Sequence, residues 1–297
     1  MEKDAIQKAG PARGLIRPLE QNPTEQNPTE QSPIEHERIL PPPSLAHLVR
    51  HFWYVSWNLE TSVVRENLPH PAIHLVFEKG RAEIVGVPTS RFAVELSEKG
   101  RVVGVRFHPG AFPSLVAGLS DSDTAGPSAK TRRSGAASDW TDRRLPAADA
   151  FGLQIEQTLT EVESQPWPDC LTPLIRILED LSARVGPLPA DALLARRLVE
   201  RLESEAELKR VEQLCDDEGI PMRTLQRLFL RHVGVSPKWV ICRFRLHEAL
   251  ARIDAGEPAN WAALALDLGY FDQAHFINDF SRFVGSTPAQ YRRRPTS

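Results

Sequence analysis

Cysteine is scarce in this chain of 297 residues, which contains only Cys170, Cys215 and Cys242 and no C-x-x-C spacing. Such usage argues against a disulfide framework and is typical of proteins in a reducing cytosol. No apolar run reaches the roughly 18 residues that a membrane-spanning helix needs. The first residues also lack the apolar segment of a signal peptide. These absences predict a protein that works in the cytoplasm and has no membrane partner.

A strong net charge is also absent, because the formal net charge is −3 at pH 7. The charges are nevertheless unevenly distributed along the chain. Residues 191–220 carry 5 basic and 9 acidic side chains, whereas residues 221–297 carry 11 basic and 6 acidic ones. The positive excess of the last segment is a modest electrostatic footprint of the kind that attracts a polyanion.

Catalytic motifs are missing as well, since the sequence contains no G-x-S-x-G, P-loop or H-E-x-x-H pattern. His70 and His74 are four residues apart. The His-x-His spacing of a cupin metal site is therefore absent, although both side chains can still share one face of a strand. We predict a protein that is not an enzyme and that holds no metal or cofactor. For Arg106 two roles stay open, contact with a ligand carboxylate or an ion pair with a nearby glutamate.

Two segments have the composition of irregular chain. Residues 1–38 are polar and rich in proline, and the hexapeptide Glu-Gln-Asn-Pro-Thr-Glu occurs twice between Glu20 and Glu30. Such a segment cannot bury a core, so we predict a disordered tail. Residues 120–138 are small, polar and interrupted by glycine and proline, which predicts a flexible loop.

Residues 39–150 contain short runs of β-branched and aromatic residues, which predict a domain built on antiparallel strands. The expected strands are 52–57, 73–77, 82–87, 91–96 and 102–107. The tetrapeptide Glu-Lys-Gly-Arg occurs at 78–81 and again at 98–101, where it is suited to tight turns. This pattern predicts a small β-barrel or half-barrel.

Residues 151–188 are predicted to form a helical connector. Apolar residues recur at helical spacing in 151–163 and 171–185. Amphipathicity alone does not say what covers the apolar faces. Two interpretations stay open, a dimer face and packing against the preceding strands.

Residues 189–297 contain one arrangement twice. Each copy has a helix, a turn with glycine (Gly219 or Gly269), a second helix with apolar residues at helical spacing, and a G-x-x-P ending. Phe229 and Phe280 hold equivalent places in the two copies. The repeat predicts two helix-turn-helix motifs in an all-α domain. A helix that begins after Ser236 joins them and spans roughly 28 Å, close to one turn of DNA.

The second copy resembles the signature of the AraC/XylS family of bacterial transcription regulators. The matching residues are Gly269, Tyr270, Asp272, His275, Phe276, Phe280, Phe283, Gly285, Pro288, Tyr291 and Arg292. The first copy matches the family's other half at Leu225, Arg227, Phe229, Gly234, Ser236, Pro237, Arg245 and Ala249. Residues 39–150 resemble the cupin-like sensor half of such regulators through Phe52-Trp53-Tyr54, Leu68-Pro69 and Phe107-His108-Pro109-Gly110. The resemblance implies an α+β protein with several domains: a sensor, a connector and a DNA-binding domain.

The resemblance also implies which residues contact double-stranded DNA. Arg and Gln are suited to this role, because Arg makes bidentate bonds to guanine and Gln to adenine. The predicted contacts are Arg223, Gln226, Arg227 and Arg231 in the first copy and Gln273, Ala274, Asn278 and Arg292 in the second. The second copy departs from the family, which commonly has Arg where Asn278 stands and a basic residue where Ser281 stands. Arg292, Arg293 and Arg294 are candidates to compensate at the DNA backbone, and Asp272 is expected to be a helix cap.

Two function classes follow from this resemblance. The first is a transcription regulator that responds to a small-molecule effector, with RNA polymerase and a second copy of the chain as further candidate partners. The second is a DNA-repair or other enzyme that carries an appended DNA-binding module. The enzyme reading needs a reactive cysteine cluster before residue 190, where only Cys170 occurs. We therefore favour the regulator.

Overall fold

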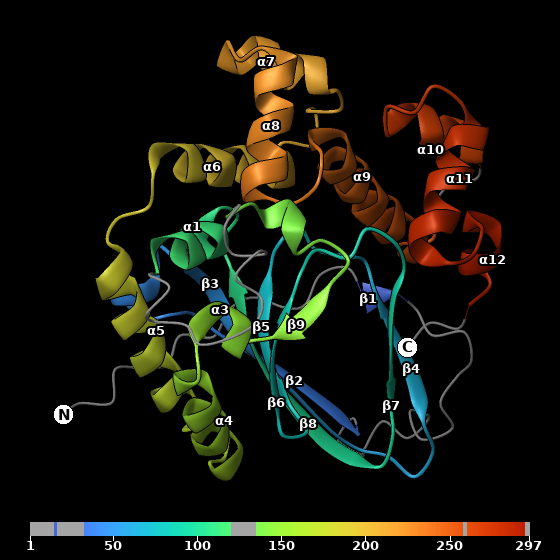
Figure 1. The fold of residues 1–297 in the computed structure, drawn as a ribbon. Helices are drawn as coiled ribbons and strands as arrows, with labels where there is room; N and C mark the ends of the chain where they lie inside the picture. The colour runs from blue at the N-terminus through green and yellow to red at the C-terminus, as the bar shows by residue number, and fades with distance from the viewer. Residues whose placement is uncertain (1–14, 17–32, 120–134, 258–259, 295–297) are drawn as a thin grey trace.

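The computed structural model describes residues 15–16, 33–119, 135–257 and 260–294 (Figure 1). Strands fill the N-terminal part of the chain and helices fill the part after residue 148. Among the helices of these residues, none combines the length and the apolar character that crossing a membrane requires. The predicted order of a sheet-rich region followed by a helical C-terminal region is confirmed.

Two antiparallel sheets form the N-terminal region. The larger sheet has the strand order β2-β3-β8-β5-β6-β9, and the smaller has the order β1-β4-β7. The strands are β1 Leu15–Ile16, β2 Ile34–Ile39, β3 Val49–Asn58, β4 Val63–Asn67, β5 His74–Glu78, β6 Arg81–Val85, β7 Phe92–Leu96, β8 Lys99–Phe107 and β9 Arg144–Pro146. The five strands predicted from the sequence correspond to β3, β5, β6, β7 and β8.

Part of the predicted disordered tail is ordered. Strand β2 lies at residues 34–39 and pairs with β3, from Ile34 opposite Trp57 to Ile39 opposite Phe52. Leu15–Ile16 pairs with β4. The expectation of disorder is therefore wrong at these positions, because the strands gain their hydrogen bonds from partners distant in the sequence. The rest of the predicted tail lies outside the described residues, as does most of the predicted loop at 120–138.

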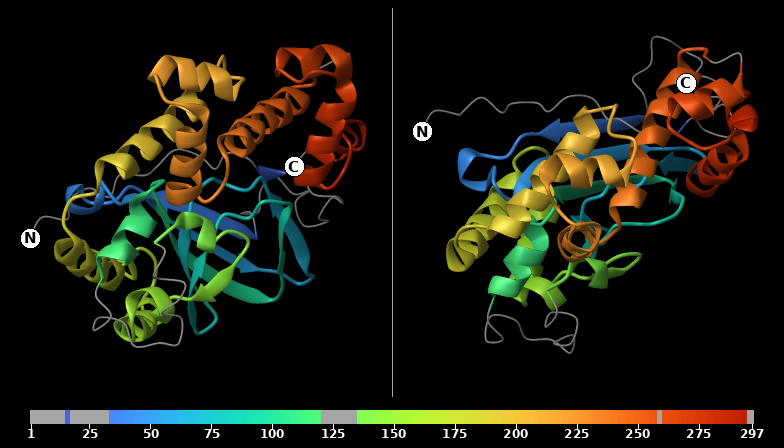
Figure 2. Two further views of the ribbon diagram at one scale, coloured as in Figure 1. Left: turned by 45° about the horizontal axis from the view of Figure 1, so that its top comes forward. Right: turned by 90° about the horizontal axis from the view of Figure 1, so that it is seen from above.

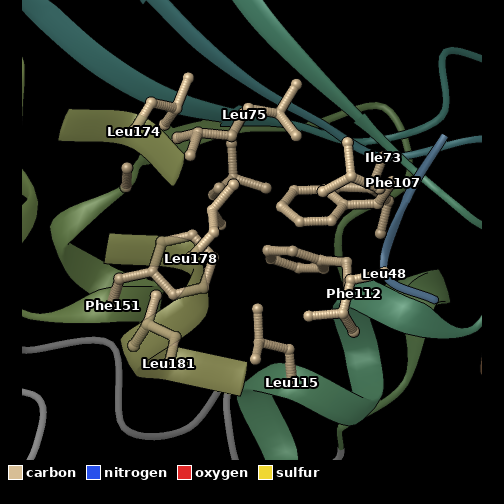
Figure 3. Packing of buried hydrophobic residues seen from close by; sticks show 14 of the residues in the cluster. Leu48, Ile73, Leu75, Phe107, Phe112, Leu115, Phe151, Leu174, Leu178 and Leu181 are labelled. Atoms are coloured by element: carbon tan, nitrogen blue, oxygen red, sulfur yellow. The ribbon is translucent and has the colours of Figure 1, made fainter. Parts of the chain in front are cut away.

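The first hydrophobic core lies on one face of the larger sheet. Figure 3 shows leucine and phenylalanine side chains from the sheet meeting those of α1 Ala111–Gly118 and α5 Leu171–Val185. The short helix α3 Ala148–Phe151 and α4 Gln154–Ser164 complete this layer. The apolar faces of α4 and α5 are thus covered by the chain's own core, which decides between the two interpretations of the connector in favour of packing.

A small apolar cluster lies between the two sheets. It contains Trp57 and Leu59 beside Leu96 of β7, with Val63 of β4 packed against them. Side chains alternate between the two faces of a strand. Trp53 and Trp57 of β3 therefore point toward the smaller sheet, whereas Phe52 points into the first core.

The second core is mostly helical and lies along one end of the sheets (Figure 2). Its helices are α6 Ala190–Ser204, α7 Val211–Glu218, α8 Met222–His232, α9 Pro237–Asp254, α10 Trp261–Asp267, α11 Gln273–Val284 and α12 Pro288–Arg292. Helix α6 belongs to both cores, since Ala192 lies in the first and Ala195 in the second. Leu68 and Val87 of the sheet region also lie in the second core. The two regions are therefore packed together, not joined only by a linker.

Candidate nucleic-acid interface

Helices α7 and α8 form the first helix-turn-helix motif. The turn between them contains Gly219 at φ 63°, a left-handed conformation that glycine adopts without steric cost. Leu214 of α7 is buried with Leu225 and Phe229 of α8. Pro221 lies directly before the first residue of α8, where its missing N–H is not needed for a helical hydrogen bond. The apolar stripe of α8 fixes which of its faces remains exposed.

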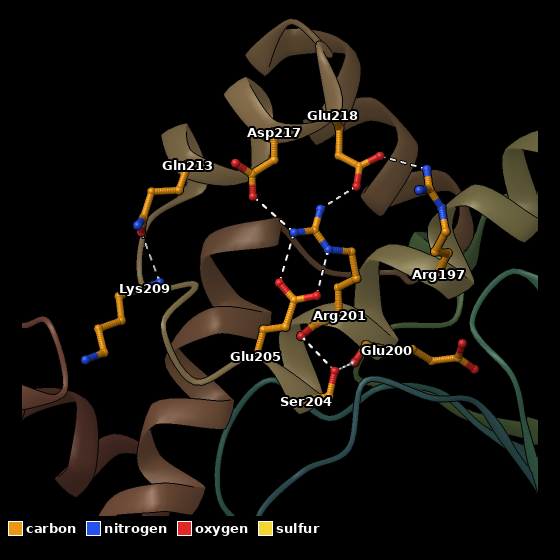
Figure 4. Close-up of polar contacts among 9 residues, drawn as sticks. All are labelled: Arg197, Glu200, Arg201, Ser204, Glu205, Lys209, Gln213, Asp217 and Glu218. Carbon is orange, nitrogen blue, oxygen red and sulfur yellow. Dashed lines mark hydrogen bonds and ion pairs between the residues drawn. The ribbon is translucent and has the colours of Figure 1, made fainter.

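An ion-pair network fixes α7 to α6 (Figure 4). The Arg201 guanidinium donates to Glu205 at 2.9 Å, to Asp217 at 3.0 Å and to Glu218 at 2.5 Å. Arg197 donates to the other oxygen of Glu218 at 2.7 Å. Hydrogen bonds to these carboxylates raise the pKa of Arg201 above its ordinary value. The network orients the supporting helix and pairs two of its acidic side chains, Asp217 and Glu218, which would otherwise repel a polyanion.

The exposed face of α8 carries the four residues predicted to contact DNA in the first motif. Arg223, Gln226, Arg227 and Arg231 are all exposed. Within the described part of the chain, none of these side chains makes a hydrogen bond or ion pair. Three cations and an amide are therefore available on one helix face for an external partner.

Helix α9 connects the two motifs and contains 18 residues. Ser236 caps its first turn by accepting a hydrogen bond from the Trp239 backbone N–H at 3.2 Å, so the predicted cap is confirmed. A helix of this length spans about 27 Å at 1.5 Å per residue. This length separates the two motifs by a distance comparable to one turn of B-DNA, about 34 Å.

Helices α10 and α11 form the second motif. Asp272 caps α11 by accepting a hydrogen bond from the His275 backbone N–H at 2.8 Å, which confirms its predicted role. Phe276, Phe280 and Phe283 are buried, as their spacing predicts. The outward face carries the predicted contact residues Gln273, Ala274 and Asn278, which are all exposed. Ile277, next to Asn278 in the sequence, is partly buried against the second core.

One further exposed residue was missed by the sequence analysis. Phe271 lies directly before the Asp272 cap and is 89% exposed. A single exposed apolar side chain is common on protein surfaces, so its exposure alone does not indicate a contact. Periodicity does not place Phe271 on either recognition helix, so the sequence offered no signal apart from the aromatic residue itself.

The arginines after α12 have three different environments. The Arg292 guanidinium lies 4.8 Å from the centroid of the Trp261 ring, and Arg293 is exposed. Arg294 is buried and donates to Glu66 of β4 at 2.9 Å. The expectation that all three contact the DNA backbone is therefore wrong for Arg294, because its charge is already paired inside the protein.

The number of basic residues in 221–297 is also larger than the number of basic side chains exposed to a partner. Arg243 of α9 is 2% exposed and donates to the Pro69 carbonyl oxygen at 2.9 Å. Arg245 is partly buried, with its guanidinium 5.1 Å from the centroid of the Tyr270 ring. Side chains buried in this way do not offer charge to a surface-bound partner.

Contacts to the sheet region hold one end of the first motif. The Gly110 backbone N–H donates to the carbonyl oxygen of His232, the last residue of α8, at 2.7 Å. The Thr141 hydroxyl donates to the Gly234 carbonyl oxygen at 2.7 Å. These contacts involve the C-terminal end of α8 and leave Arg223 and Arg227, near its N-terminal end, exposed.

No cluster of three or more His, Cys, Asp or Glu side chains in the described residues could hold a metal ion. Cys170, on which the enzyme alternative depends, is fully buried, and burial raises the pKa of its thiol to about 11. A thiol with a raised pKa is a poor nucleophile at neutral pH. The arrangement gives no support to chemistry at this cysteine.

Two protein families match separate parts of the chain. A helix-turn-helix domain matches residues 214–294, and a domain of unknown function, DUF6597, matches residues 37–122. The residues predicted to contact DNA all lie within the first of these matches.

Curated relatives match the C-terminal part. An uncharacterized HTH-type transcriptional regulator of Haemophilus influenzae is 30% identical over 83 residues, which are 28% of this chain and 28% of that protein. The HTH-type transcriptional activator RhaS of Pectobacterium atrosepticum is 30% identical over 28% of this chain and 30% of its own length. A putative AraC-like transcription regulator of Streptomyces lividans is 29% identical over 36% of this chain and 35% of its own length. The chain thus covers only about a third of each relative.

Among solved structures, ToxT from Vibrio cholerae aligns over 83% of this chain and 98% of its own, with 13% sequence identity and a TM-score of 0.39. The sequence matches and the two helix-turn-helix motifs concern the same C-terminal segment. This segment of the chain belongs to the AraC-type helix-turn-helix family.

Proposed function

We propose that the chain is a sequence-specific DNA-binding transcription regulator of the AraC type. The observation that carries this proposal is the exposed face of α8, where Arg223, Gln226 and Arg227 have no partner among the described residues. In helix-turn-helix proteins the N-terminal residues of the second helix contact base edges in the major groove. The same end of α8 points away from the sheet region (Figure 1).

Roles for the side chains follow from their chemistry. Arg223 and Arg227 are assigned to guanine, whose O6 and N7 accept the two parallel N–H bonds of a guanidinium, and Gln226 is assigned to adenine. Arg231, at the docked end of α8, is assigned to a phosphate.

The second motif is assigned a weaker contact. Gln273 and Asn278 provide amide groups, Ala274 allows close approach, and Arg292 is assigned to the DNA backbone. Phe271 offers an apolar surface that fits a thymine methyl group.

The remaining parts of the chain receive roles within the same proposal. Residues 39–150 act as a cupin-like sensor for a small-molecule effector, residues 151–188 support it, and residues 189–297 bind DNA. The protein acts in the cytoplasm, where a bound regulator meets RNA polymerase at the promoter. The proposal also includes a second copy of the chain as a partner of the protein.

Binding of the full chain to its own upstream DNA tests the proposal. Affinity should fall steeply with salt, because each phosphate contact releases counterions. The Arg223→Ala/Arg227→Ala double variant should lose this binding, whereas Arg176→Ala, at an exposed position on α5, should retain it. A folded wild-type chain without affinity for this DNA at low salt would contradict the proposal.

A zinc measurement on the same protein separates the regulator from the repair-enzyme alternative. The regulator is expected to hold no stoichiometric zinc. Zinc held tightly at one equivalent per chain would favour the enzyme instead.

A further inference from the structure

A group of basic side chains lies on the face of the larger sheet that points toward the smaller sheet. His51 of β3 and His74 of β5 are both directly opposite Arg106 of β8. Residues opposite each other on antiparallel strands share a face, with Cα atoms about 4.5–5.5 Å apart. His51 and Arg106 are both 7% exposed, whereas His74 keeps partial contact with solvent.

Helix α9 adds a second buried cation to this group. The Arg243 Nε donates to the Pro69 carbonyl oxygen at 2.9 Å, and its Nη2 lies 2.9 Å from Nδ1 of His70. A guanidinium has no acceptor, so the Nδ1 of His70 must accept this bond. Pro69 and His70 lie between β4 and β5, so the contact joins the sheet region directly to the helix that connects both DNA-binding motifs.

The group contains hydrogen-bond donors in excess of acceptors. His70 accepts through Nδ1 from Arg243, and His74 accepts through Nδ1 from the Trp53 indole at 3.2 Å. In a neutral imidazole one nitrogen accepts and the other carries the proton. Both rings therefore present an Nε2–H donor. Arg106 makes no hydrogen bond or ion pair with any described residue, and its buried Nε has no partner.

Among the described residues, the negative charge acting on both guanidinium groups is limited to one carboxylate. Glu203 is the only carboxylate that acts on both Arg106 and Arg243, and it is already paired with Arg50 at 2.8 Å. Burying a charged group without a partner costs several kcal/mol. Such a cost is commonly retained where a protein binds a ligand of opposite charge.

The protonation states support this account. Burial lowers the pKa of Arg106 to about 9 and that of Arg243 to about 10, so both remain charged at neutral pH. Burial and the neighbouring Arg106 lower the pKa of His74 to about 3, so this ring stays neutral and keeps its Nε2–H donor. At pH 7 the group therefore contains two buried positive charges, on Arg106 and Arg243, together with the N–H donors of the neutral His70 and His74 rings.

We propose that Arg106, Arg243, His70 and His74 form a binding site for a small anion, a carboxylate or a phosphate, at the junction between the sheets and α9. The effector that the regulator reads would bind through this anionic group. The inference deepens the proposed function and rests on it for the regulatory consequence alone. His70 and His74 each keep partial exposure as whole residues.

Occupation of this site has a structural consequence for both motifs. Arg243 now bonds to a carbonyl oxygen and a neutral ring, which are weaker partners than an anion. An anion held by Arg106 offers Arg243 a charged acceptor fixed to the sheet. Because Arg243 belongs to α9, the ligand changes the contact through which the sheet region holds the two DNA-binding motifs.

Thermal unfolding of the full chain without DNA tests the site. The probes are sodium benzoate, inorganic phosphate and the neutral analogue benzamide, at ionic strength held constant with sodium chloride. A ligand that binds only the folded state raises Tm with the logarithm of its concentration above Kd, by about 2–4 °C for each kcal/mol of stabilisation. We expect such a rise with benzoate or phosphate and none with benzamide. The anion that gives the larger rise in Tm shows whether the site prefers a carboxylate or a phosphate.

Variants connect the effect to the site. Arg106→Met and Arg243→Gln should each weaken anion binding by about tenfold or more, the loss expected for a hydrogen bond to a charged group. Arg176→Gln, which changes an arginine on α5, should leave it unchanged. Without probe, Arg106→Met should keep or raise Tm, because it removes a buried charge that has no partner. If Arg106→Met does not fold, Arg106→Lys replaces it, and weaker binding than wild type is expected.

Two results would overturn the inference: wild-type protein that gains no stability from either anion, or a gain that persists in both variants. Neither outcome involves DNA, so each is distinct from a failure of the proposed function. A DNA-binding assay on the same preparations then measures whether the effective anion changes affinity for the upstream DNA.

Discussion

Arginine has three distinct roles in this chain, which are determined by what surrounds each side chain. Arg227 is exposed on α8 and has no partner among the described residues. Arg294 is buried in an ion pair with Glu66, and Arg106 is buried without an ion pair to any residue that the structure describes. The guanidinium of Arg294 thus links two regions, whereas we propose that Arg227 contacts DNA and that Arg106 binds an anion.

The first prediction concerns Arg227. Arg227→Ala should reduce the affinity for the specific site by about 1–3 kcal/mol, with the loss confined to one base position. The reason is that a bidentate bond discriminates one base from the others. Competition binding with a set of single-base variants measures the effect, and Arg176→Ala is the control. An equal loss on every sequence would make Arg227 a phosphate contact.

At the scale of elements, the sequence predicts what depends on local pattern. Alternation predicts β3 and β8, and the capping residues Ser236 and Asp272 mark the starts of α9 and α11. Strand β2 could not be predicted from local pattern, because its sequence is polar and its pairing partner β3 begins ten residues later. Pairing across that distance has no local signal.

The candidate DNA-contact site also has some features that local sequence pattern predicts and others that depend on residues distant in the chain. The exposed face of α8 follows from helical periodicity, so Arg223 and Gln226 could be predicted. The burial of Arg243 and Arg294 could not, because their partners Pro69 and Glu66 lie more than 170 residues away in the chain. Their surroundings depend on how the two regions dock.

The second prediction concerns the unequal chemistry of the two recognition helices. The predicted contact residues of α8 are three cations and an amide, whereas those of α11 are two amides and an alanine with Asp272 beside them. The bound DNA should therefore contain a strongly specified half and, about ten base pairs away, a weaker half. Gln226→Ala should alter sequence preference more than Gln273→Ala. A base-by-base affinity scan with each variant measures this, and two equally informative halves would contradict it.

At the scale of the whole molecule, docking of the helical region depends on buried polar contacts. The carboxylate of Glu66, 3% exposed, receives hydrogen bonds from Arg294 and from Arg91. The indole of Trp239 in α9 donates to the Thr89 carbonyl oxygen at 3.3 Å. Such contacts hold α9 and α12 against the smaller sheet and its neighbouring loop.

The third prediction concerns Glu66. Glu66→Gln removes the buried carboxylate charge that pairs with both Arg294 and Arg91, so the free energy of unfolding should fall by about 3–5 kcal/mol. Glu161→Gln, which breaks an exposed ion pair with Arg176, should cost less than about 1 kcal/mol. Denaturant unfolding of both variants measures the difference. Equal small losses would show that the Glu66 contact does not stabilise docking.

The fourth prediction concerns the effect of pH on stability. Burial lowers the pKa of His51 to about 2 and that of His108 to about 3, and it also lowers the pKa of His232. Below pH 6.5 the unfolded chain therefore binds protons that the folded chain excludes. Stability should be fully retained above that pH and should fall as the pH drops toward the folded-state values.

Each fully suppressed histidine should contribute a loss of about 1.4 kcal/mol per pH unit below 6.5. Denaturant unfolding between pH 7 and pH 5 measures the slope. His51→Leu should reduce that slope by the contribution of one histidine, because it removes one of the groups that bind a proton only in the unfolded chain. A free energy of unfolding that stays constant from pH 7 to pH 5 would mean that these rings accept protons inside the fold. For His108, the carboxylate that could compensate the added charge is Glu200, at 3.6 Å.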